Sequence, residues 1–384
     1  MRTVAVSVVL IALSAIAVLT GLLPVSDVVH LWGRVWPILL FVTAITVVAE
    51  LAAAAGVFTA LARQVARGGR GRAWLLWLLV VAVAAISTVF LSLDTTAVLL
   101  TPVVVVLARQ VGLNPLPFAL TTVWMANTGS LLLPISNLTN LLAQQAMGDL
   151  PPAQFVALMW AAALVAMVLP MAVVFLLSRR SLLARYEPAA RGRSSDPVLF
   201  WTTVAVLIVL IPLLVSGIPV WMPSTAAALV LAVAFLARQR TAVRLGLVPW
   251  RLLLFAAALF LFVAALQSAG LGAVLGRIAG QGESPLALLR LSLTGMLSAN
   301  AVDNLPAYLA LEPVAGSPVR LAALLIGVNV GPLITPWASL ATLLWHQRLT
   351  AMDAGIRWRR YILLGAVVAP VTVVASTLAL ALTA

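Results

Sequence analysis

Residues 127–142 read NTGSLLLPISNLTNLL, and residues 329–344, at a constant offset of 202 positions, read NVGPLITPWASLATLL. Asparagine, glycine, proline and small polar residues recur in register, and both copies interrupt long apolar stretches. Inside a membrane, irregular backbone is tolerated only where it lines a cavity within the protein. Two interruptions at corresponding places of two halves are therefore typical of the binding site of a secondary transporter.

The composition is that of a membrane protein. Of the 384 residues, 64% are hydrophobic and 9% are charged, and the mean hydropathy is +1.16. Apolar runs long enough to span a bilayer recur from end to end, so we expect an all-α polytopic membrane protein. The first run, residues 4–23, lacks a clear small-x-small cleavage site, and we interpret it as the first membrane helix rather than a signal peptide.

Several other classes of protein are disfavoured. Cysteine is absent, which excludes disulfides, thiolate metal sites and any mechanism that holds a soft metalloid through sulfur. His30 and His346 make a poor metal site as a bare pair, so neither a metal nor a cofactor is predicted. The sequence has no Walker loop, no His-Glu-x-x-His and no Gly-x-Ser-x-Gly, which argues against an ATPase and against a membrane-embedded enzyme.

The basic residues, all of them arginine, orient the chain. The net charge is +13, and the arginines fall almost wholly in short loops between apolar runs. We therefore interpret them as topology signals that place the N-terminus in the cytoplasm, and not as a surface that binds nucleic acid. Four clusters are predicted to be cytoplasmic: Arg63, Arg67, Arg70 and Arg72; Arg179, Arg180, Arg185, Arg191 and Arg193; Arg238, Arg240, Arg244 and Arg251; Arg348, Arg357, Arg359 and Arg360.

Arginine placement also predicts two re-entrant hairpins. With Arg2 and Arg109 added, nineteen of the 23 arginines lie on one side only if residues 73–109 enter and leave the membrane on that side. The turn of this inward hairpin is expected at residues 92–96. By the same reasoning residues 285–312 form an outward hairpin with its turn at residues 298–306. The arginines left on the outer side are Arg34, Arg277, Arg290 and Arg320.

The predicted organisation is an inverted-topology repeat with two re-entrant hairpins and two broken transmembrane helices. Residues 1–178 form the first repeat, with the inward hairpin at 73–109 and a broken helix at about 116–147. Residues 179–197 form a cytoplasmic linker loop. Residues 198–384 contain a linking helix to about 215, spans at about 224–237 and 252–269, the outward hairpin at 285–312, a second broken helix at about 319–347 and a last span from Tyr361.

Small polar residues at the hairpin tips and helix breaks are the candidate binding residues. Half-helix ends supply partial charges there, and Asn, Ser and Thr supply both donors and acceptors. Such residues also tie membrane helices together, but their repetition in register beside Gly and Pro favours a binding centre. The candidates are Ser92, Thr95, Thr96, Asn127, Gly129, Asn137, Asn140, Asn300, Asn304, Asn329, Gly331, Thr335, Ser339 and Thr342.

Three acidic residues are placed at membrane depth: Asp94, Asp303 and Glu50. An isolated charge there costs at least about 2.5–3.5 kcal/mol, so such residues usually serve an ion or proton path. Asp94 and Asp303 are predicted to take up and release a coupling proton. The alternative is that each carboxylate caps the half-helix that follows it. Glu50 either lines a proton path or pairs with a buried cation such as Arg290.

Six short motifs point to a family. They are DTTAVLLTP (94–102), GLNPLPF (112–118) and ANTGS (126–130) in the first half, and DNLP (303–306), GVNVGP (327–332) and TPWASLATLLW (335–345) in the second. Together they resemble the arsenite and antimonite efflux permeases of the ArsB type, over residues 35–382. The resemblance implies membership of the ion-transporter superfamily, which also contains sodium-coupled dicarboxylate symporters and a sodium/proton antiporter branch.

The chain departs from that family at three places. Leu93-Asp94 stands where the family more often has Asn-Asp, and residues 133–137 read LPISN where it has TPIGN. Trp337-Ala338 stands where it has Ile-Gly, so Trp337 and Ser136 are the residues expected to reshape the pocket.

The sequence therefore predicts a secondary transporter in a bacterial cytoplasmic membrane. Its expected substrates are arsenite or antimonite, extruded in exchange for protons. The alternatives are sodium/proton exchange, transport of a carboxylate or inorganic anion, and, more distantly, a membrane binding protein without transport. A channel is disfavoured by the inverted repeat, which favours alternating access. The resemblance also implies two candidate partners, a soluble ATPase and a second copy of the chain in a homodimer.

Overall fold

A computed structural model describes residues 2–186 and 196–384. Over these ranges the regular structure is helical, apart from one isolated bridge between Arg72 and Arg185. Nine of the helices in the described ranges are long and apolar enough to cross a membrane. The predicted all-α polytopic class is thus confirmed. Residues 187–195 of the predicted linker loop, including Arg191 and Arg193, lie outside the described residues.

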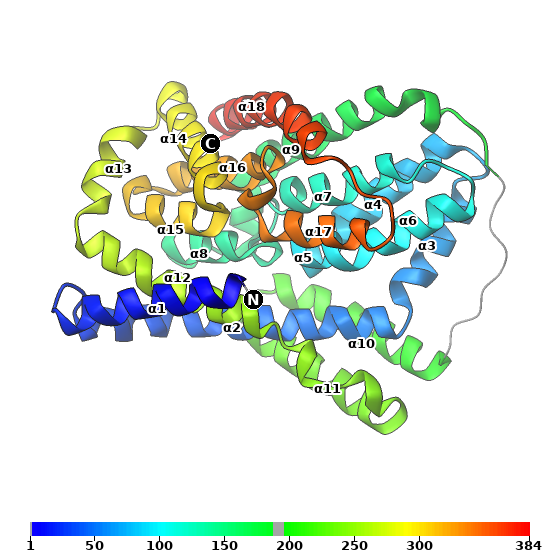
Figure 1. Cartoon of the computed structure of the whole chain (residues 1–384), viewed down its shortest axis with the longest axis horizontal. Helices are drawn as coiled ribbons and strands as arrows, with labels where there is room; N and C mark the ends of the chain where they lie inside the picture. Colours follow the sequence, from blue (N-terminus) through cyan, green and yellow to red (C-terminus); the bar gives the residue numbers. More distant parts are fainter. Residues whose placement is uncertain (1, 187–195) are drawn as a thin grey trace.

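The helices form two parts, a lower layer and a main body (Figure 1). The lower layer consists of α1 (Arg2–Leu19), α2 (Val25–Ala54), α10 (Pro197–Val215), α11 (Trp221–Arg238) and α12 (Trp250–Ser268). Within it α1 packs on α12, and α2 packs on α11 and α12. The main body contains α4 to α9 and α14 to α18, while α3 (Val57–Gly68) and α13 (Leu271–Ala279) connect the two parts.

Each predicted hairpin bends at a single residue. In the first, α4 (Ala73–Leu91) meets α5 (Leu93–Thr95) at Ser92, and a π-helical turn (Thr96–Leu100) leads into α6 (Thr101–Gln110). Both α4 and α6 contact α3. In the second, α14 (Pro285–Val302) meets α15 (Asn304–Ala315) at Asp303. The expected turns at 92–96 and 298–306 are therefore too long, since most of those residues are helical.

The two tips share one rare backbone conformation. Ser92 has φ 102° and ψ 159°, and Asp303 has φ 116° and ψ 156°. Non-glycine residues rarely adopt this region, which costs about 1–3 kcal/mol and clusters at functional sites. Each side chain caps the helix that follows: Ser92 Oγ accepts from the Thr95 N–H and Asp303 Oδ1 from the Leu305 N–H. A capped one-residue bend makes a longer loop unnecessary.

Both predicted helix breaks are confirmed. In the first half α7 (Leu116–Gly129) is followed by a 3-10 turn (Pro134–Ser136) and α8 (Leu138–Ala146). In the second, α16 (Pro318–Val330) is followed by 3-10 turns (Gly331–Leu333, Pro336–Ala338) and α17 (Leu340–Thr350). Proline starts a 3-10 turn in each copy, and the extended residue before the next helix is Asn137 or Ser339. The inverted relation of the halves and their division at residue 178 stay predictions.

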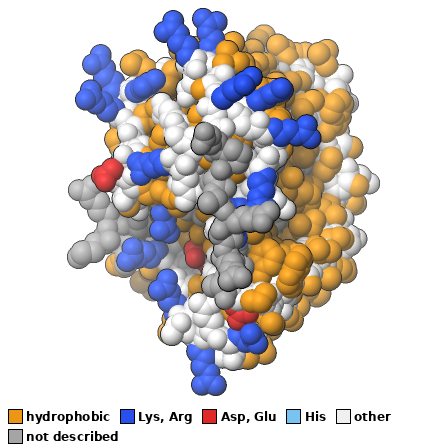
Figure 2. All heavy atoms as spheres, turned by 90° about the vertical axis from the view of Figure 1, so that its right-hand side faces the viewer, with side chains coloured by type: hydrophobic (Ala, Val, Ile, Leu, Met, Phe, Trp, Pro, Cys, Tyr) orange, Lys and Arg blue, Asp and Glu red, His pale blue; other side chains and the backbone are white. Residues whose placement is uncertain are grey.

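Two long helices, α9 (Pro152–Leu182) and α18 (Trp358–Thr383), pack against each other on the side of the main body away from the lower layer. Viewed from the right-hand end of Figure 1, the molecule presents many arginine side chains beside a hydrophobic flank (Figure 2). Positive charge therefore gathers on this face of the molecule, and the cytoplasmic placement of the arginine clusters stays a prediction.

Candidate functional site

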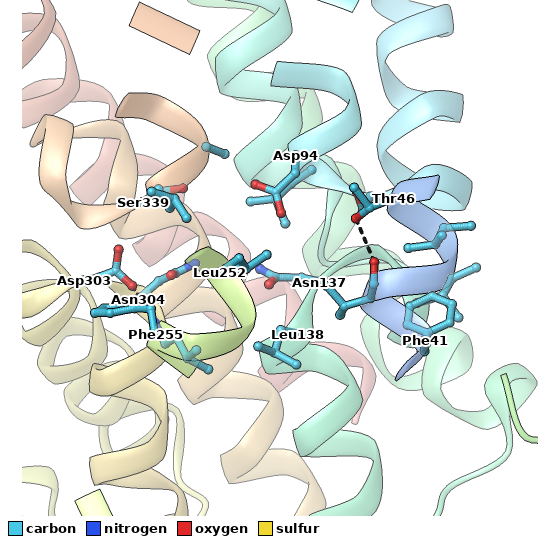
Figure 3. Close-up of a pocket in the computed structure, with 18 residues that line it drawn as sticks. Phe41, Thr46, Asp94, Asn137, Leu138, Leu252, Phe255, Asp303, Asn304 and Ser339 are labelled. Atoms are coloured by element: carbon cyan, nitrogen blue, oxygen red, sulfur yellow. Dashed lines mark hydrogen bonds between the residues drawn. The ribbon is translucent and has the colours of Figure 1, made fainter. Parts of the chain in front are cut away.

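A cavity of about 70 Å³ lies where the two hairpin tips, the two helix breaks and the lower layer meet (Figure 3). Helices α2 and α12 supply a mainly apolar wall that includes Phe41, Leu252 and Phe255. The hairpins and breaks supply the polar wall. Six candidate residues from the sequence line the cavity: Ser92, Asp94, Asn137, Asp303, Asn304 and Ser339.

A network of buried amides joins the two breaks. The Asn329 side chain accepts from Asn137 Nδ2 at 2.9 Å and from the Thr139 hydroxyl at 3.1 Å, and it donates to Asn140 Oδ1 at 2.9 Å. Asn140 Nδ2 in turn donates to the carbonyl oxygens of Ser130 and Leu133, which the first break exposes. These bonds connect α16 to the first break, 190 positions away in sequence.

The counterpart position in the first half is bonded less completely. Asn127 Nδ2 donates to the Val123 carbonyl in its own helix and, at 3.3 Å, to Thr342 Oγ1 of α17. Its Oδ1 is buried and has no hydrogen-bond partner among the described residues, and the same holds for Ser339 Oγ. By the 202-residue offset, Asn127 and Ser339 match Asn329 and Asn137, which do bond to each other. The donor and the acceptor of the Asn329 amide are therefore both hydrogen-bonded, whereas Asn127 Oδ1 and Ser339 Oγ have no partner among the described residues.

Asp94 and Asp303 lie on opposite sides of the cavity, and the side chains of Asn137 and Asn304 point toward one another between them (Figure 3). The capping alternative is confirmed for Asp303, whose carboxylate accepts the Leu305 N–H at 3.1 Å. It is wrong for Asp94, because Ser92 caps α5 and Asp94 lies inside the helix. No hydrogen bond to the Asp94 carboxylate occurs within the described ranges.

The remaining candidates surround the lining. The Thr95 hydroxyl donates to the Leu91 carbonyl, and Thr96 bonds to Thr88, so both stabilise the first tip. Asn300 uses its whole amide near the second tip: it donates to Met296 and Gly331 carbonyls and accepts from the N–H and hydroxyl of Thr335.

The candidate glycines pack closely beneath the breaks. A side-chain carbon added at Gly331 would lie 3.0 Å from the Met296 backbone, and one at Gly129 would lie 3.1 Å from Met125 Sδ. The glycines at these two positions therefore permit close packing and do not line the cavity.

Three sequence expectations are corrected. Glu50 does not pair with Arg290, because that guanidinium donates to the carbonyls of Ile278 and Arg277. Trp337 does not line the cavity: it is 51% exposed and its indole N–H donates to the Asn300 carbonyl. Ser136 also lies outside the lining, since its hydroxyl donates to the Val89 carbonyl of α4.

Sequence reasoning missed part of the site. Phe41 and Thr46 of α2 and Phe255 of α12 line the cavity, but each lies in an apolar stretch of its helix that shows no motif. A fourth carboxylate, that of Glu312 on α15, has a side chain only 11% exposed and forms an ion pair with Arg34 of α2. Arg34 Nη2 also donates to the Leu142 carbonyl of α8, so this pair joins the lower layer to both α15 and α8.

Comparison of the sequence with known proteins identifies the family of this chain. Residues 1–342 match the citrate transporter family, CitMHS. The chain belongs to the citrate transporter family. The chain is also 29% identical to the arsenical pump membrane protein of Escherichia coli K12, in an alignment that covers 91% of this chain and 86% of that one. The arsenical pump membrane protein of Yersinia enterocolitica is 29% identical with the same coverage.

A solved structure supports the same fold. The YdaH transporter of Alcanivorax borkumensis superposes with a TM-score of 0.59 over 99% of this chain and 97% of that one, at 17% identity. The resemblance predicted from the motifs is confirmed. This member of the citrate transporter family is a multi-pass membrane protein and a secondary transporter, not an enzyme.

Proposed function

We propose that the protein extrudes arsenite or antimonite from the cytoplasm in exchange for protons. The observation that supports this most is the cavity itself, which is small, polar on one wall and lined by two carboxylates without a basic side chain among the described lining residues. Its volume of about 70 Å³ is roughly five to seven times the ~10–15 Å³ that one water molecule requires. A solute of a few heavy atoms matches this size.

The hydrogen-bonding character of the lining suits an uncharged metalloid hydroxide. Each hydroxyl of such a solute both donates and accepts. The lining offers amides and hydroxyls that do the same, and carboxylates that accept. Ser339 Oγ is buried without a partner among the described residues, and a buried polar atom left unpaired costs about 1–3 kcal/mol. A bound hydroxide would relieve that cost. The relatives named arsenical pump membrane proteins support the same substrate class.

Proton coupling is assigned to Asp94 and Asp303. Both carboxyl groups line the cavity. When either of them is protonated, the neutral carboxylic acid competes with a bound solute for the same space and the same hydrogen bonds. Glu50 lies one helical turn beyond Thr46, a cavity-lining residue of α2, on the same face of that helix. It is therefore the candidate for the next proton acceptor along the path.

A second candidate function is sodium/proton exchange. Carboxylate, amide and hydroxyl oxygens are ligands that hard cations prefer, and the cavity lining supplies all three. A polyanion such as citrate suits the cavity less well, because two carboxylates face it. The predicted soluble ATPase and homodimer partners stay predictions.

The test is transport into everted membrane vesicles under an imposed proton gradient, with trivalent arsenic, sodium and citrate measured in parallel. We expect arsenite accumulation that collapses when the gradient is dissipated and that is abolished by Asp94→Asn or Asp303→Asn. Sodium movement without arsenite movement would favour the second candidate. Unchanged gradient-driven transport in both variants would overturn the coupling role of the two carboxylates.

A further inference from the structure

Two arginine clusters that are far apart in sequence meet beside one pocket. Helix α9 ends with Arg179 and Arg180 in its last turn, and α18 begins with Arg359 and Arg360 in its first. The two helices pack against each other, and residues from both of these ends line one pocket. The pocket there has a volume of about 430 Å³, and Arg179, Arg180 and Arg360 all line it.

The guanidinium groups at this pocket are available for a ligand. Arg179, Arg180 and Arg360 are exposed, and the two ion pairs found among the described residues involve other arginines. No acidic residue belongs to the described lining. The hydroxyl-bearing residues Ser178 and Ser181 add hydrogen-bond donors at the rim.

A neighbouring pocket of about 660 Å³ continues the basic surface. It is lined by Arg357, Arg359 and Arg360 and shares Leu116, Arg360 and Leu364 with the first pocket. Helix α18 begins here, and its N-cap residue makes no side-chain cap hydrogen bond. The free N–H groups of that first turn add partial positive charge.

Exposed leucine side chains lie beside the arginines in the lining of the same two pockets. Leu176 and Leu177, one turn before the arginines of α9, are 62% and 60% exposed, and Leu363 of α18 is 60% exposed. Figure 2 shows arginines gathered at this end of the molecule next to a hydrophobic flank. Positive charge and exposed leucines thus occur side by side, as at a membrane surface.

We infer that these two pockets form a binding site for an anionic phospholipid, with the phosphodiester held by Arg179, Arg180 and Arg360 and the acyl chains lying against the exposed leucines. Basic pockets between transmembrane helices on the cytoplasmic side are suited to anionic headgroups. The site is separate from the central cavity, with which it shares no lining residue. It would join α9 to α18 through a lipid.

The test compares two charge-matched triple variants of the full chain. One is Arg179→Gln, Arg180→Gln, Arg360→Gln; the control is Arg240→Gln, Arg244→Gln, Arg251→Gln, which removes the same charge from a cluster outside both pockets. Purified protein is titrated with phosphatidylglycerol and, separately, phosphatidylcholine, and bound lipid is counted by native mass spectrometry. Thermal melting in detergent without added lipid checks that both variants are folded.

Each arginine near an anionic surface strengthens attraction by ~1 kcal/mol, or about fivefold. We expect phosphatidylglycerol affinity to fall at least about tenfold in the pocket variant and less than about twofold in the control. Equal losses in both variants would show unspecific attraction to surface charge and overturn the site. Equal binding of phosphatidylcholine, or full displacement by millimolar inorganic phosphate, would overturn the assignment to an anionic lipid. Unchanged lipid binding in the pocket variant would do the same and would favour an acidic protein partner.

Discussion

Replacing Asn329 or its counterpart Asn127 by alanine should separate structural from transport roles at the centre. Asn329 makes three hydrogen bonds to side chains of the first break, at 2.9, 3.1 and 2.9 Å. Asn127 makes one bond to another helix, at 3.3 Å. Both side chains are almost fully buried, so the difference lies in the bonds and not in solvent exposure.

The magnitudes follow from these bonds. Hydrogen bonds between membrane helices average about 0.6 kcal/mol each. Asn329→Ala should therefore lower the free energy of unfolding by about 2 kcal/mol, and by more where the abandoned amides stay unpaired, whereas Asn127→Ala should lower it by about 0.6 kcal/mol. Reversible unfolding in mixed micelles measures the two values. Transport in everted vesicles is measured on the same preparations.

The free Oδ1 of Asn127 makes this a test of function as well. Asn127 is not among the residues that line the cavity, so the test asks whether a bound solute reaches this atom. If the atom accepts a hydrogen bond from a solute hydroxyl, its loss should raise the apparent KM for arsenite roughly two- to tenfold, the equivalent of one net hydrogen bond. Asn127→Ala should thus impair transport while leaving stability nearly intact. Wild-type transport by this variant would show that Asn127 only ties helices together. Equal loss of stability in both variants would refute the asymmetric network.

Three further predictions concern packing and charge. Gly327→Ala places a side-chain carbon 2.1 Å from the Ser292 carbonyl oxygen, and this overpacking should lower the free energy of unfolding by about 1–3 kcal/mol and so lower the melting temperature. The control Gly33→Ala, whose added carbon has no atom within 4 Å, should leave the melting temperature unchanged. Glu312→Leu should lower the free energy of unfolding in micelles by roughly 1–3 kcal/mol. Breaking a fully buried ion pair costs ~3–5 kcal/mol, and the loss here should be smaller because the Arg34 side chain is 36% exposed. The hydrogen bond from Arg238 lowers the pKa of Asp196 in the folded protein below its value in the unfolded chain. The ionised Asp196 therefore stabilises the fold at pH values above its unfolded pKa, and this stabilisation is lost as the pH falls through its folded pKa. Thermal melting should show Asp196→Asn less stable than wild type at pH 7 and equal to it at acid pH below both pKa values.

The helix breaks and the class of protein were readable from sequence because their causes are local. Pro134 and Pro336 each begin a 3-10 turn, and they lack the backbone N–H that would continue a preceding helix. The residues around them supply caps and small side chains. Hydropathy fixes long spans in the same way, and α10, α11 and α12 begin and end within a few residues of their predicted positions.

The chain bends inside each expected turn, but at one residue and not over five or nine, and the re-entry of the two segments into the membrane stays a prediction. Asp94 and Asp303 look equivalent in sequence, since each lies in a short polar segment between apolar runs. The structure puts Asp303 at the tip itself and Asp94 two residues beyond Ser92, because a single residue at positive φ reverses the chain. Composition alone does not show which residue will adopt that conformation.

Sequence by itself determined that this chain is a helical, multi-pass transporter with two polar interruptions at matching places. Only the tertiary structure decided which polar groups face the cavity and which satisfy one another. Asn137 and Asn329 bond across 192 positions, while Asn127 and Ser339 each keep a polar atom without a partner among the described residues. Phe41, in a stretch of α2 without a motif, lines the cavity. Those outcomes depend on distances between helices remote in sequence, and hydrogen bonding is decided within a few tenths of an ångström.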